Sequence, residues 1–595
     1  MYNSLVAPPV SISTKATLHA PPEELWRFLS DTERLNRAVH LPVISFLPFP
    51  DRQKRGHYRA ETAVYGLKLR YEEFPFEWVE GRFYQVERRF ESGPFERFLG
   101  GMRFSSTAGG TEVEVFADLT PRGWLGSILA GRVGRKGTQD MLEVARAFER
   151  HAARPEAEPV PALPPEGGIQ LGVLETRLAQ VKVPGPLDRL RSHLQTAGDL
   201  EVVRMRPFEL ADRWGEDRMK VLRYFLFASR TGVLDLAWDV LCPNCRVPSR
   251  RIRTLAEMKS EAHCDTCDVK YGADFARSVE ARFTVNPAIR EARRDTYCIG
   301  GPANMPDIVA QLRVAPGQVR KEPFTIPGPL RVRSYQAPGI LPLEGTRVRI
   351  DPGGVRVLPG EPGVLEVTNA LPDEALVVVE RETWQKSAAT AALVTSLQDF
   401  RDLFPAEAVA PGEEIGISSL AVLFTDLKGS TDLYRRLGDP KAFAFVQNHF
   451  RYLVEKVTHH KGGVVKTMGD AVMATFASGK DALQAAVEMQ RGWEEFRRDH
   501  GDYPGVSLRV GLHQGSAIAI NNAGKLDYFG TTVNMAARVQ AKSDGDDVVF
   551  TQAIEEDPEV QSYLASEGGR RETLTVPLKG LGGEHTLIRS RPMKK

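Results

Sequence analysis

At 595 residues the chain is too long for one hydrophobic core, and its length predicts roughly three to five domains. Its apolar (42%) and charged (26%) contents are those of an ordinary globular protein, and a formal net charge of +1 gives no support to nucleic acid as a partner. No apolar run approaches the ~18 residues of a membrane span, the longest candidate being Trp124 to Ala130, and the N-terminus lacks the features of a signal peptide. These features predict a soluble, cytoplasmic, multidomain α+β protein.

Residues 1–153 are predicted to form one α+β domain. Val10 to Leu18 alternates as a strand does, and the prolines and acidic residues that follow suit the start of a helix. Further alternating segments predict a strand meander, which closes on a helix over about 138–151. This order of elements resembles the START-like, helix-grip fold related to polyketide cyclases. The resemblance implies a cavity for an apolar small ligand, and the alternative is a packed interaction domain.

Residues 154–184 are rich in proline at their start and predict an extended linker. Residues 185–322 are predicted to be a helical region that also holds a cysteine cluster. Apolar residues recur there at helical spacing, and one short helix is expected over 234–238.

Residues 323–384 change to short strands punctuated by glycine and proline, which predicts a small all-β sandwich. The segment 385–416 is predicted to contain one helix, from about Gln385 to Leu403, and a connector. It leads into a last domain over 417–595.

Four of the five cysteines form two C-x-x-C pairs separated by eighteen residues. Because two intervening residues let both sulfurs of a pair converge on one Zn²⁺ at about 2.3 Å, the pattern predicts a zinc ribbon in a reducing compartment. Four protein ligands close the coordination sphere, so this zinc would be structural. The fifth cysteine, Cys298, is predicted to be a small buried hydrophobe. The predicted zinc ligands are Cys242, Cys245, Cys264 and Cys267.

A predicted buried strand, 421–424, leads directly into a turn that opens a helix. Asp426 stands at the strand end, where its carboxylate can bind Mg²⁺ while backbone N–H groups of the turn bind phosphate oxygens. Taken alone, an aspartate in such a turn is more often a helix cap. The candidate substrate-binding residues that follow it are Leu427, Lys428, Gly429, Ser430 and Thr431.

Two later segments carry further candidate groups. Two β-rich runs flank Gly469-Asp470, which predicts a hairpin whose tip presents a second carboxylate. Two converging carboxylates can hold a pair of divalent ions, one to activate a hydroxyl and one to neutralise a triphosphate. Lys466 lies in an otherwise apolar strand, where lysine is seldom buried without a function. Asn534 and Arg538 share one face of a predicted helix, where they can hold a ribose and stabilise charge on a phosphate.

These three segments, in this order and spacing, resemble the class III adenylyl and guanylyl cyclase catalytic domain over about 418–591. The resemblance implies a ferredoxin-like α/β fold and two metal ions, Mg²⁺ or Mn²⁺, held by Asp426 and Asp470. Active sites of this family lie between two catalytic domains. Because only one such domain is present, the resemblance implies a homodimer with two equivalent sites.

The same resemblance assigns Lys466 and Asp527 to the adenine ring, Asn534 to the ribose and Arg538 to the transition state. Adenine offers a donor at N6 and an acceptor at N1, which an acid and a lysine match; guanine reverses the pattern. The pair therefore favours ATP over GTP, with 3′,5′-cyclic AMP and pyrophosphate as products. The alternatives are a guanylate cyclase, a zinc-ribbon nucleic-acid-binding regulator whose cyclase domain only binds nucleotide, and an inactive scaffold.

Overall fold

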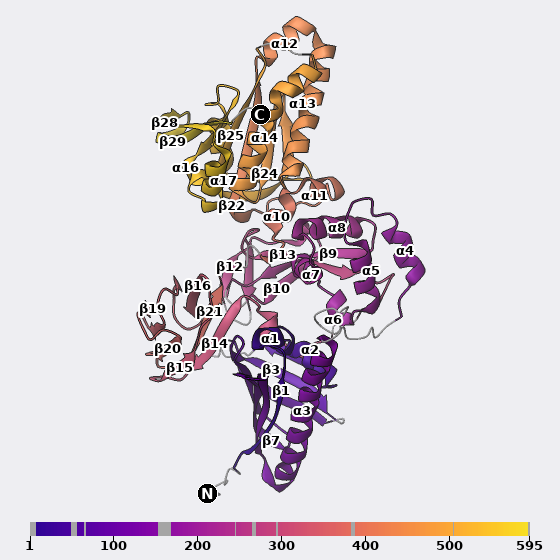
Figure 1. The fold of residues 1–595 in the computed structure, drawn as a ribbon, viewed down its shortest axis with the longest axis vertical. Helices are drawn as coiled ribbons and strands as arrows, with labels where there is room; N and C mark the ends of the chain where they lie inside the picture. Colours follow the sequence, from indigo (N-terminus) through magenta and orange to yellow (C-terminus); the bar gives the residue numbers. More distant parts are fainter. Residues whose placement is uncertain are drawn as a thin grey trace.

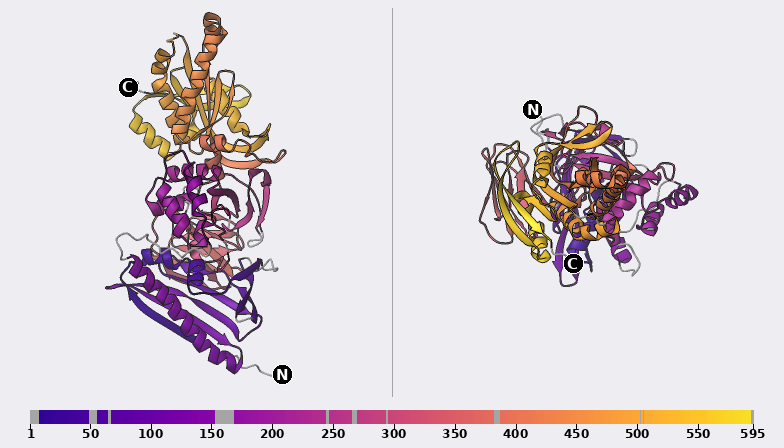
Figure 2. Two further views of the ribbon diagram at one scale, coloured as in Figure 1. Left: turned by 90° about the vertical axis from the view of Figure 1, so that its right-hand side faces the viewer. Right: turned by 90° about the horizontal axis from the view of Figure 1, so that it is seen from above.

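The computed structural model describes residues 8–48, 56–64, 67–152, 168–243, 246–264, 269–292, 295–381, 387–501, 503 and 505–592. The molecule is elongated, with the N-terminal domain at one end of the long axis, the C-terminal domain at the other, and the central residues between them (Figure 1). A second view, turned by 90° about that axis, shows the same order of domains (Figure 2).

The N-terminal domain is a curved antiparallel sheet that packs against one long helix. The helix, α3, runs from Gly123 to Ala152, and it therefore begins well before the predicted residue 138. The sequence did not predict this first half as helical because it contains glycines at 126, 131, 134 and 137, and glycine lowers helix propensity. The other elements are β1 (Val10–Leu18), α1 (Pro22–Leu29), α2 (Thr32–Ala38), β2 (Ile44–Pro48), β3 (Tyr58–Val64), β4 (Leu67–Glu73), β5 (Glu77–Val79), β6 (Phe83–Phe90), β7 (Phe95–Thr107) and β8 (Gly110–Pro121).

The first part of the predicted linker, up to residue 167, lies outside the described part of the chain, and its second half contains helix α4 (Leu171–Leu178). A helical layer then covers a three-stranded sheet in the order β10-β9-β13. The predicted short helix at 234–238 is wrong, since those residues form strand β9, whose apolar run is too short to tell the two apart. The elements are α5 (Leu187–Thr196), α6 (Asp199–Val202), α7 (Pro207–Trp214), α8 (Arg218–Arg230), β9 (Leu234–Leu241), β10 (Pro248–Ile252), β11 (Glu261–Cys264), β12 (Val269–Gly272) and β13 (Val279–Val285).

The next strands form two sheets around a common apolar core. The strand region starts at Ile308, earlier than the predicted residue 323. Its first strand, β14, also pairs with β5 through Ala310 and Val79, so one sheet continues into the N-terminal domain. The strands are β14 (Ile308–Val314), β15 (Val319–Pro323), β16 (Leu330–Ser334), β17 (Ile340–Pro342), β18 (Arg347–Asp351), β19 (Gly354–Leu358), β20 (Val364–Asn369) and β21 (Ala375–Arg381).

Where a single helix from 385 to 403 was predicted, the structure has two short helices, α10 (Ala391–Ser396) and α11 (Gln398–Leu403). Leu397 between them has extended backbone angles (φ −78°, ψ 135°), which no α-helix accommodates. Residues 385 and 386 lie outside the described part of the chain.

The C-terminal domain is an eight-stranded mixed sheet in the order β23-β24-β22-β25-β27-β29-β28, with β26 paired to β25. Ala421 and Leu423 face a core shared with α13 and α14, whereas Val422 and Phe424 face the core of the central region. The elements are β22 (Ile415–Lys428), α12 (Ser430–Leu437), α13 (Asp439–His459), β23 (Gly463–Met468), β24 (Ala471–Phe476), α14 (Gly479–Asp499), β25 (Ser507–Asn522), β26 (Lys525–Phe529), α15 (Thr531–Gln540), β27 (Asp547–Thr551), α16 (Gln552–Glu555), α17 (Pro558–Glu567), β28 (Arg570–Leu578) and β29 (Leu581–Arg591).

None of the helices in the described ranges combines the length and the apolarity needed to cross a bilayer.

Candidate active site

Asp426 stands near the C-terminal end of β22, opposite Arg509 in the register with β25. The strand extends further than predicted, so that Leu427 and Lys428 belong to β22 and Leu427 is buried. The turn itself is Gly429, whose φ of 85° lies in the left-handed region that favours glycine. Helix α12 then begins at Ser430. The order of strand, turn and helix is therefore the predicted one, but the strand ends later than predicted and only Gly429 separates it from the helix.

Asp470 follows Gly469 in the tight turn between β23 and β24, which is the predicted hairpin. Its Oδ2 atom is buried and has no hydrogen-bond partner among the described residues. Burial, and next the negative charge of Asp470, raise the pKa of the Asp426 carboxyl. Arg509, whose Nη1 lies 3.6 Å from Asp426 Oδ2, opposes that rise. The fold thus brings two carboxylates together with one buried oxygen unpaired.

This donor set fits a divalent cation. Mg²⁺ and Mn²⁺ prefer oxygen ligands, and a buried carboxylate oxygen without a hydrogen bond is costly unless a cation satisfies it. The mutual repulsion of Asp426 and Asp470, seen in the raised pKa of Asp426, is also what a bound cation would relieve. The two residues therefore could hold metal at the end of β22.

Lys466 and Asp527 form a second pair. A bulge between Val464 and Lys466 shifts the β23 register, and the Lys466 ammonium lies 2.6 Å from Asp527 Oδ2 on β26. Asn522 Nδ2 also donates to Asp527 Oδ2, at 2.9 Å. Burial opposes the ionisation of Asp527, but these donors and the Tyr528 N–H together hold the pKa of its carboxyl below its usual range. The two predicted base-reading residues thus meet within one chain.

Asn534 and Arg538 lie one turn apart on α15, and both are exposed. The helix starts after Gly530, and Thr532 Oγ1 donates to Ser516 O of β25 to hold its first turn on the sheet. Within the described residues, no hydrogen bond or ion pair joins Asn534 or Arg538 to the carboxylate pair or to Lys466. The single chain therefore presents the predicted site residues in separate groups.

The sequence did not point to Arg509 or Asn522, which contact the site carboxylates, or to Gln540, which influences the pKa of Asp426. Arg509 and Gln540 both lower the pKa of Asp426, and Asn522 donates to Asp527. Arg509 lies directly across from Asp426 on the neighbouring strand. The signal available in the sequence was Arg509, a basic residue between apolar neighbours in its strand. Its nearness to Asp426 could be inferred only once the pairing of the two strands was known.

The helices α10 and α11 form hydrogen bonds with both strands that carry the Lys466–Asp527 pair. Gln398 receives Val464 N–H at its Oε1 (2.8 Å), while its own N–H donates to Gly462 O at the start of β23 (3.0 Å). On β26, the Tyr528 hydroxyl donates to Thr395 Oγ1 at 3.1 Å. Arg401 donates to the Leu526 carbonyl on the same strand at 3.2 Å. The segment that enters the C-terminal domain thus also fixes its candidate base-reading residues.

The same helices are bound to the central region. Arg223 of α8 forms a two-pronged ion pair with Asp399, at 2.6 and 3.2 Å. Phe400 is buried and meets Trp238 edge to face, with ring centroids 5.9 Å apart. A backbone hydrogen bond joins Ala392 N–H to Phe275 O. A continuous set of contacts therefore links the central region to β23 and β26.

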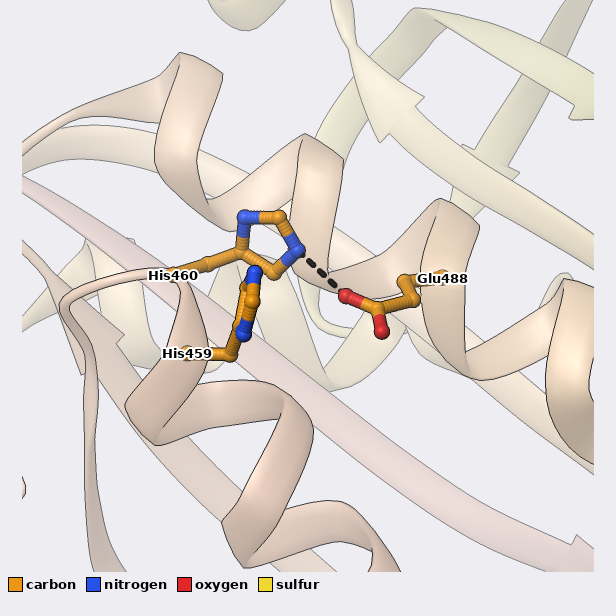
Figure 3. A group of neighbouring side chains, drawn as sticks. All are labelled: His459, His460 and Glu488. Atoms are coloured by element: carbon orange, nitrogen blue, oxygen red, sulfur yellow. Dashed lines mark hydrogen bonds and ion pairs between the residues drawn. The ribbon is translucent and has the colours of Figure 1, made fainter.

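A separate cluster at the end of α13 has the residue types of a metal site. Figure 3 shows His460 aimed at Glu488, with His459 beside it; the His460 Nε2–Glu488 Oε2 distance is 2.7 Å. However, the Lys456 ammonium already pairs with Glu488 Oε1 at 3.1 Å. A cleft of about 960 Å³ that includes His460 and Glu488 contains neither Asp426 nor Asp470. This cluster is therefore separate from the carboxylate pair, and a lysine satisfies its carboxylate.

Two of the predicted zinc ligands, Cys242 and Cys264, are buried in the same apolar cluster. Cys242 directly follows β9 and Cys264 ends β11, at the mouth of the β11–β12 hairpin. Cys245 and Cys267 lie outside the described residues. Cys298 is buried, as predicted, and burial raises the pKa of its thiol to about 12.

Comparison with known proteins identifies three regions of the chain. Residues 414–581 match the adenylate and guanylate cyclase catalytic domain, and residues 18–146 match the polyketide cyclase / dehydrase and lipid transport family. Residues 170–296 match a family of unknown function, DUF5939, which the sequence reasoning did not name. The chain therefore carries a cyclase catalytic domain at its C-terminal end and a START-like, polyketide cyclase-type domain at its N-terminal end, as predicted.

Individual relatives match over the C-terminal part. An adenylate cyclase of Anabaena cylindrica is 25% identical over 158 residues, 24% of this chain and 32% of that protein. Adenylate cyclase 2 of Rhizobium meliloti (strain 1021) is 29% identical over 130 residues, 20% of this chain and 35% of that protein. The chain thus spans about a third of the length of these curated relatives. The adenylyl cyclase CyaB from P. aeruginosa is similar over 30% of this chain and 95% of that chain, at 19% identity and a TM-score of 0.27.

Proposed function

We propose that the protein is an adenylate cyclase that converts ATP into 3′,5′-cyclic AMP and pyrophosphate. One observation carries the proposal: within a cyclase catalytic domain, Asp426 and Asp470 are close enough to perturb each other, and Asp470 keeps a buried oxygen unpaired. Such a pair destabilises a metal-free protein, and a bound cation would relieve the repulsion between the two carboxylates.

Asp426 and Asp470 would hold two Mg²⁺ or Mn²⁺ ions. Bound metal would supply activation of the ribose 3′-hydroxyl and neutralisation of charge on the triphosphate. The chain's own groups do the positioning. Backbone N–H groups at the start of α12, after Gly429, would bind the phosphates, and Ser430 and Thr431 belong to this first turn. Arg509 opposes the rise of the Asp426 pKa and so favours its ionised form.

Lys466 and Asp527 support ATP over GTP as the substrate. In the substrate-free chain they satisfy each other at 2.6 Å. When adenine enters, the Lys466 ammonium donates to N1 and the Asp527 carboxylate accepts from the N6 amino group. Guanine would place a carbonyl against Asp527 and an N–H against Lys466, leaving both side chains unpaired. A guanylate cyclase is therefore the less favoured reading of the same fold.

Asn534 and Arg538 are proposed to orient the ribose and to stabilise charge on the α-phosphate during in-line attack. Both side chains are exposed and separate from the carboxylate pair in one chain. This separation supports a head-to-tail homodimer in which one subunit supplies Asp426 and Asp470 and its partner supplies the remaining groups. A cytoplasmic location is proposed with this assignment.

Two assignments outside the catalytic domain complete the proposal. Cys242, Cys245, Cys264 and Cys267 would hold a structural zinc ion, supported by the burial of Cys242 and Cys264 in one cluster. The START-like domain would bind an apolar small ligand and regulate the cyclase.

The proposal is tested by turnover of ATP and of GTP, each with Mg²⁺ and with Mn²⁺, by the wild-type protein beside Asp470→Ala. We expect metal-dependent cyclic AMP from the wild type, little cyclic GMP, and no product from the variant. Absence of any cyclic nucleotide from the wild type, or equal turnover by Asp470→Ala, would contradict the assignment. A preference for GTP would retain the cyclase and overturn the roles of Lys466 and Asp527.

A further inference from the structure

The first turns of α3 expose large apolar side chains to solvent. Trp124 is 72% exposed, Ile128 53%, Leu129 40% and Val133 51%. Among the described helices, no other carries more than one exposed large apolar residue. Such a concentration on one helix indicates a surface that meets an apolar partner.

The packing of α3 shows that these side chains have no role in the core. Among the described side chains of the same turns, the buried ones are small, namely Gly126, Ala130, Gly134 and Thr138. A Cβ atom on Gly126 would lie 2.3 Å from Pro94 O, and one on Gly134 would lie 2.4 Å from a methyl group of Ile12. A glycine is therefore required at 126, where the neighbour is backbone, and a larger residue at 134 would have to displace the Ile12 side chain. These first turns reverse the usual pattern, in which large apolar residues face inward and polar ones face outward.

Basic residues follow the apolar ones along the helix. Arg132, Arg135 and Lys136 are all exposed, and the sequence has no acidic residue between Asp118 and Asp140. Lys136 pairs with Asp140 at 2.7 Å, but both groups are solvated, so that the pair is weak. At 1.5 Å per residue, Arg132 lies about 12 Å along the axis from Trp124. The apolar turns thus come first and a cationic collar comes behind them.

The position of these turns leaves them accessible. Val10 of β1 pairs with Leu119 of β8, directly before α3, so the first turns of α3 lie at the same tip as the start of the described chain. This tip is at the opposite end of the long axis from the cyclase domain (Figures 1 and 2). A surface bound there would leave the cyclase domain in open solvent.

We propose that the N-terminal turns of α3 dock the protein on an anionic phospholipid surface. Trp124, Ile128, Leu129 and Val133 enter the boundary between headgroups and acyl chains, a depth of about 5–10 Å, and the cations behind them contact lipid phosphates. A tryptophan followed by arginines and lysines is the composition that such interfaces favour. A second copy of the same tip is a poorer partner, because it would place like-charged collars against each other.

The test is sedimentation of the full-length protein with vesicles of phosphatidylcholine alone and of phosphatidylcholine mixed with phosphatidylserine. We expect binding to the mixed vesicles, weakened by salt, and at least tenfold weaker binding to the neutral ones. The double variant Trp124→Ser/Ile128→Ser should lose at least tenfold in affinity, and Arg132→Ser/Arg135→Ser several-fold. Because all four side chains are exposed, the variants should unfold at the wild-type temperature, which a thermal melt checks.

Val319→Ser is the matched control, since Val319 is 51% exposed on β15, away from α3, and should bind vesicles as the wild type does. Failure of the wild type to bind the mixed vesicles would overturn the proposal, as would unchanged binding by the Trp124/Ile128 variant. If that variant instead abolishes a self-association of the free protein, the tip binds a second copy and the lipid assignment is wrong.

Discussion

Replacing Asp470 by asparagine should stabilise the metal-free protein while removing its response to metal. In the wild type, Asp470 leaves a buried carboxylate oxygen unpaired, and its charge helps to raise the pKa of Asp426. A carboxyl whose pKa is raised on folding destabilises the folded state above its unfolded pKa. That destabilisation is present at pH 7 and is relieved as the pH falls through the folded pKa. Asparagine keeps the shape of the side chain and removes the charge.

The size of the effect follows from these two terms. An unpaired buried polar group costs about 1–3 kcal/mol, more when it is charged, and asparagine recovers only the charged part. Arg509 lies 3.6 Å from Asp426, and Asp426 is about a third exposed, so that solvent and a neighbouring cation already screen the repulsion. We therefore expect a gain of about 1 kcal/mol, which is about 2–4 °C for a domain of this size.

The assay is thermal unfolding in EDTA and in excess MgCl₂, for wild type, Asp470→Asn and the control Asp499→Asn. Asp499 is exposed at the end of α14 and carries the same charge change within the same domain. Mg²⁺ should raise the melting temperature of the wild type and of the control, because a ligand that binds only the folded state stabilises it. Asp470→Asn should have a higher melting temperature than the wild type in EDTA, and Mg²⁺ should not change that temperature. A lower melting temperature in EDTA, or a full Mg²⁺ response, would refute the reasoning.

Three further outcomes are expected. Asp426→Ala and Asn534→Ala should each be nearly inactive. An equimolar mixture should recover about a quarter of wild-type cyclic AMP production, because half of the randomly formed dimers are mixed and each of these has one of its two sites intact. No recovery would exclude the shared site. Tyr528→Phe removes the hydrogen bond to Thr395 Oγ1, and it should lower the free energy of unfolding in urea by about 1 kcal/mol. It should also lower the ratio of kcat/KM for ATP to that for GTP. An unchanged ratio would mean that the contact stabilises the fold without affecting the choice of base. His449 is fully buried and burial lowers its pKa to about 3, so the unfolded chain binds the proton first as the pH falls below 6.5. The wild type should therefore lose about 2 kcal/mol between pH 6.5 and 5 that His449→Phe retains, measured by urea unfolding at each pH.

The catalytic domain was the part of the molecule that the sequence predicted best. Its strand, turn and helix around Asp426 and its hairpin at Asp470 are local features, in which neighbouring residues decide the backbone. Their partners are not local. Arg509 reaches Asp426 only through the pairing of β22 with β25, and the contact of Thr395 with Tyr528 joins residues 133 positions apart. Such contacts depend on register and tertiary packing, which composition and periodicity do not specify.

The domain boundaries were predicted less well, for the same reason. β5 and β14 pair although more than two hundred residues separate them, so that the sandwich continues the N-terminal sheet. The first half of α3 carries five glycines and an outward apolar face, both of which argue against a helix in a search for inward amphipathic stripes. The helix prediction therefore failed at the first turns of α3, the surface that we propose to dock on lipid.

The junction before the catalytic domain is best understood as part of that domain's core. A catalytic domain that began at residue 417 would cut β22 after its first two residues and discard α10 and α11. Leu397 and Phe400 are buried in the same cluster as Ile415, Leu526 and Tyr528, and that cluster continues into the central region.

Packed interiors transmit small displacements because they contain little free space to absorb them. A shift of the central region therefore moves α10 and α11, and these helices hold β23 through Gln398 and β26 through Thr395 and Arg401. Those two strands carry Lys466 and Asp527. A signal from the upstream domains would thus have a direct route to the candidate base-reading pair, through which it would alter substrate binding.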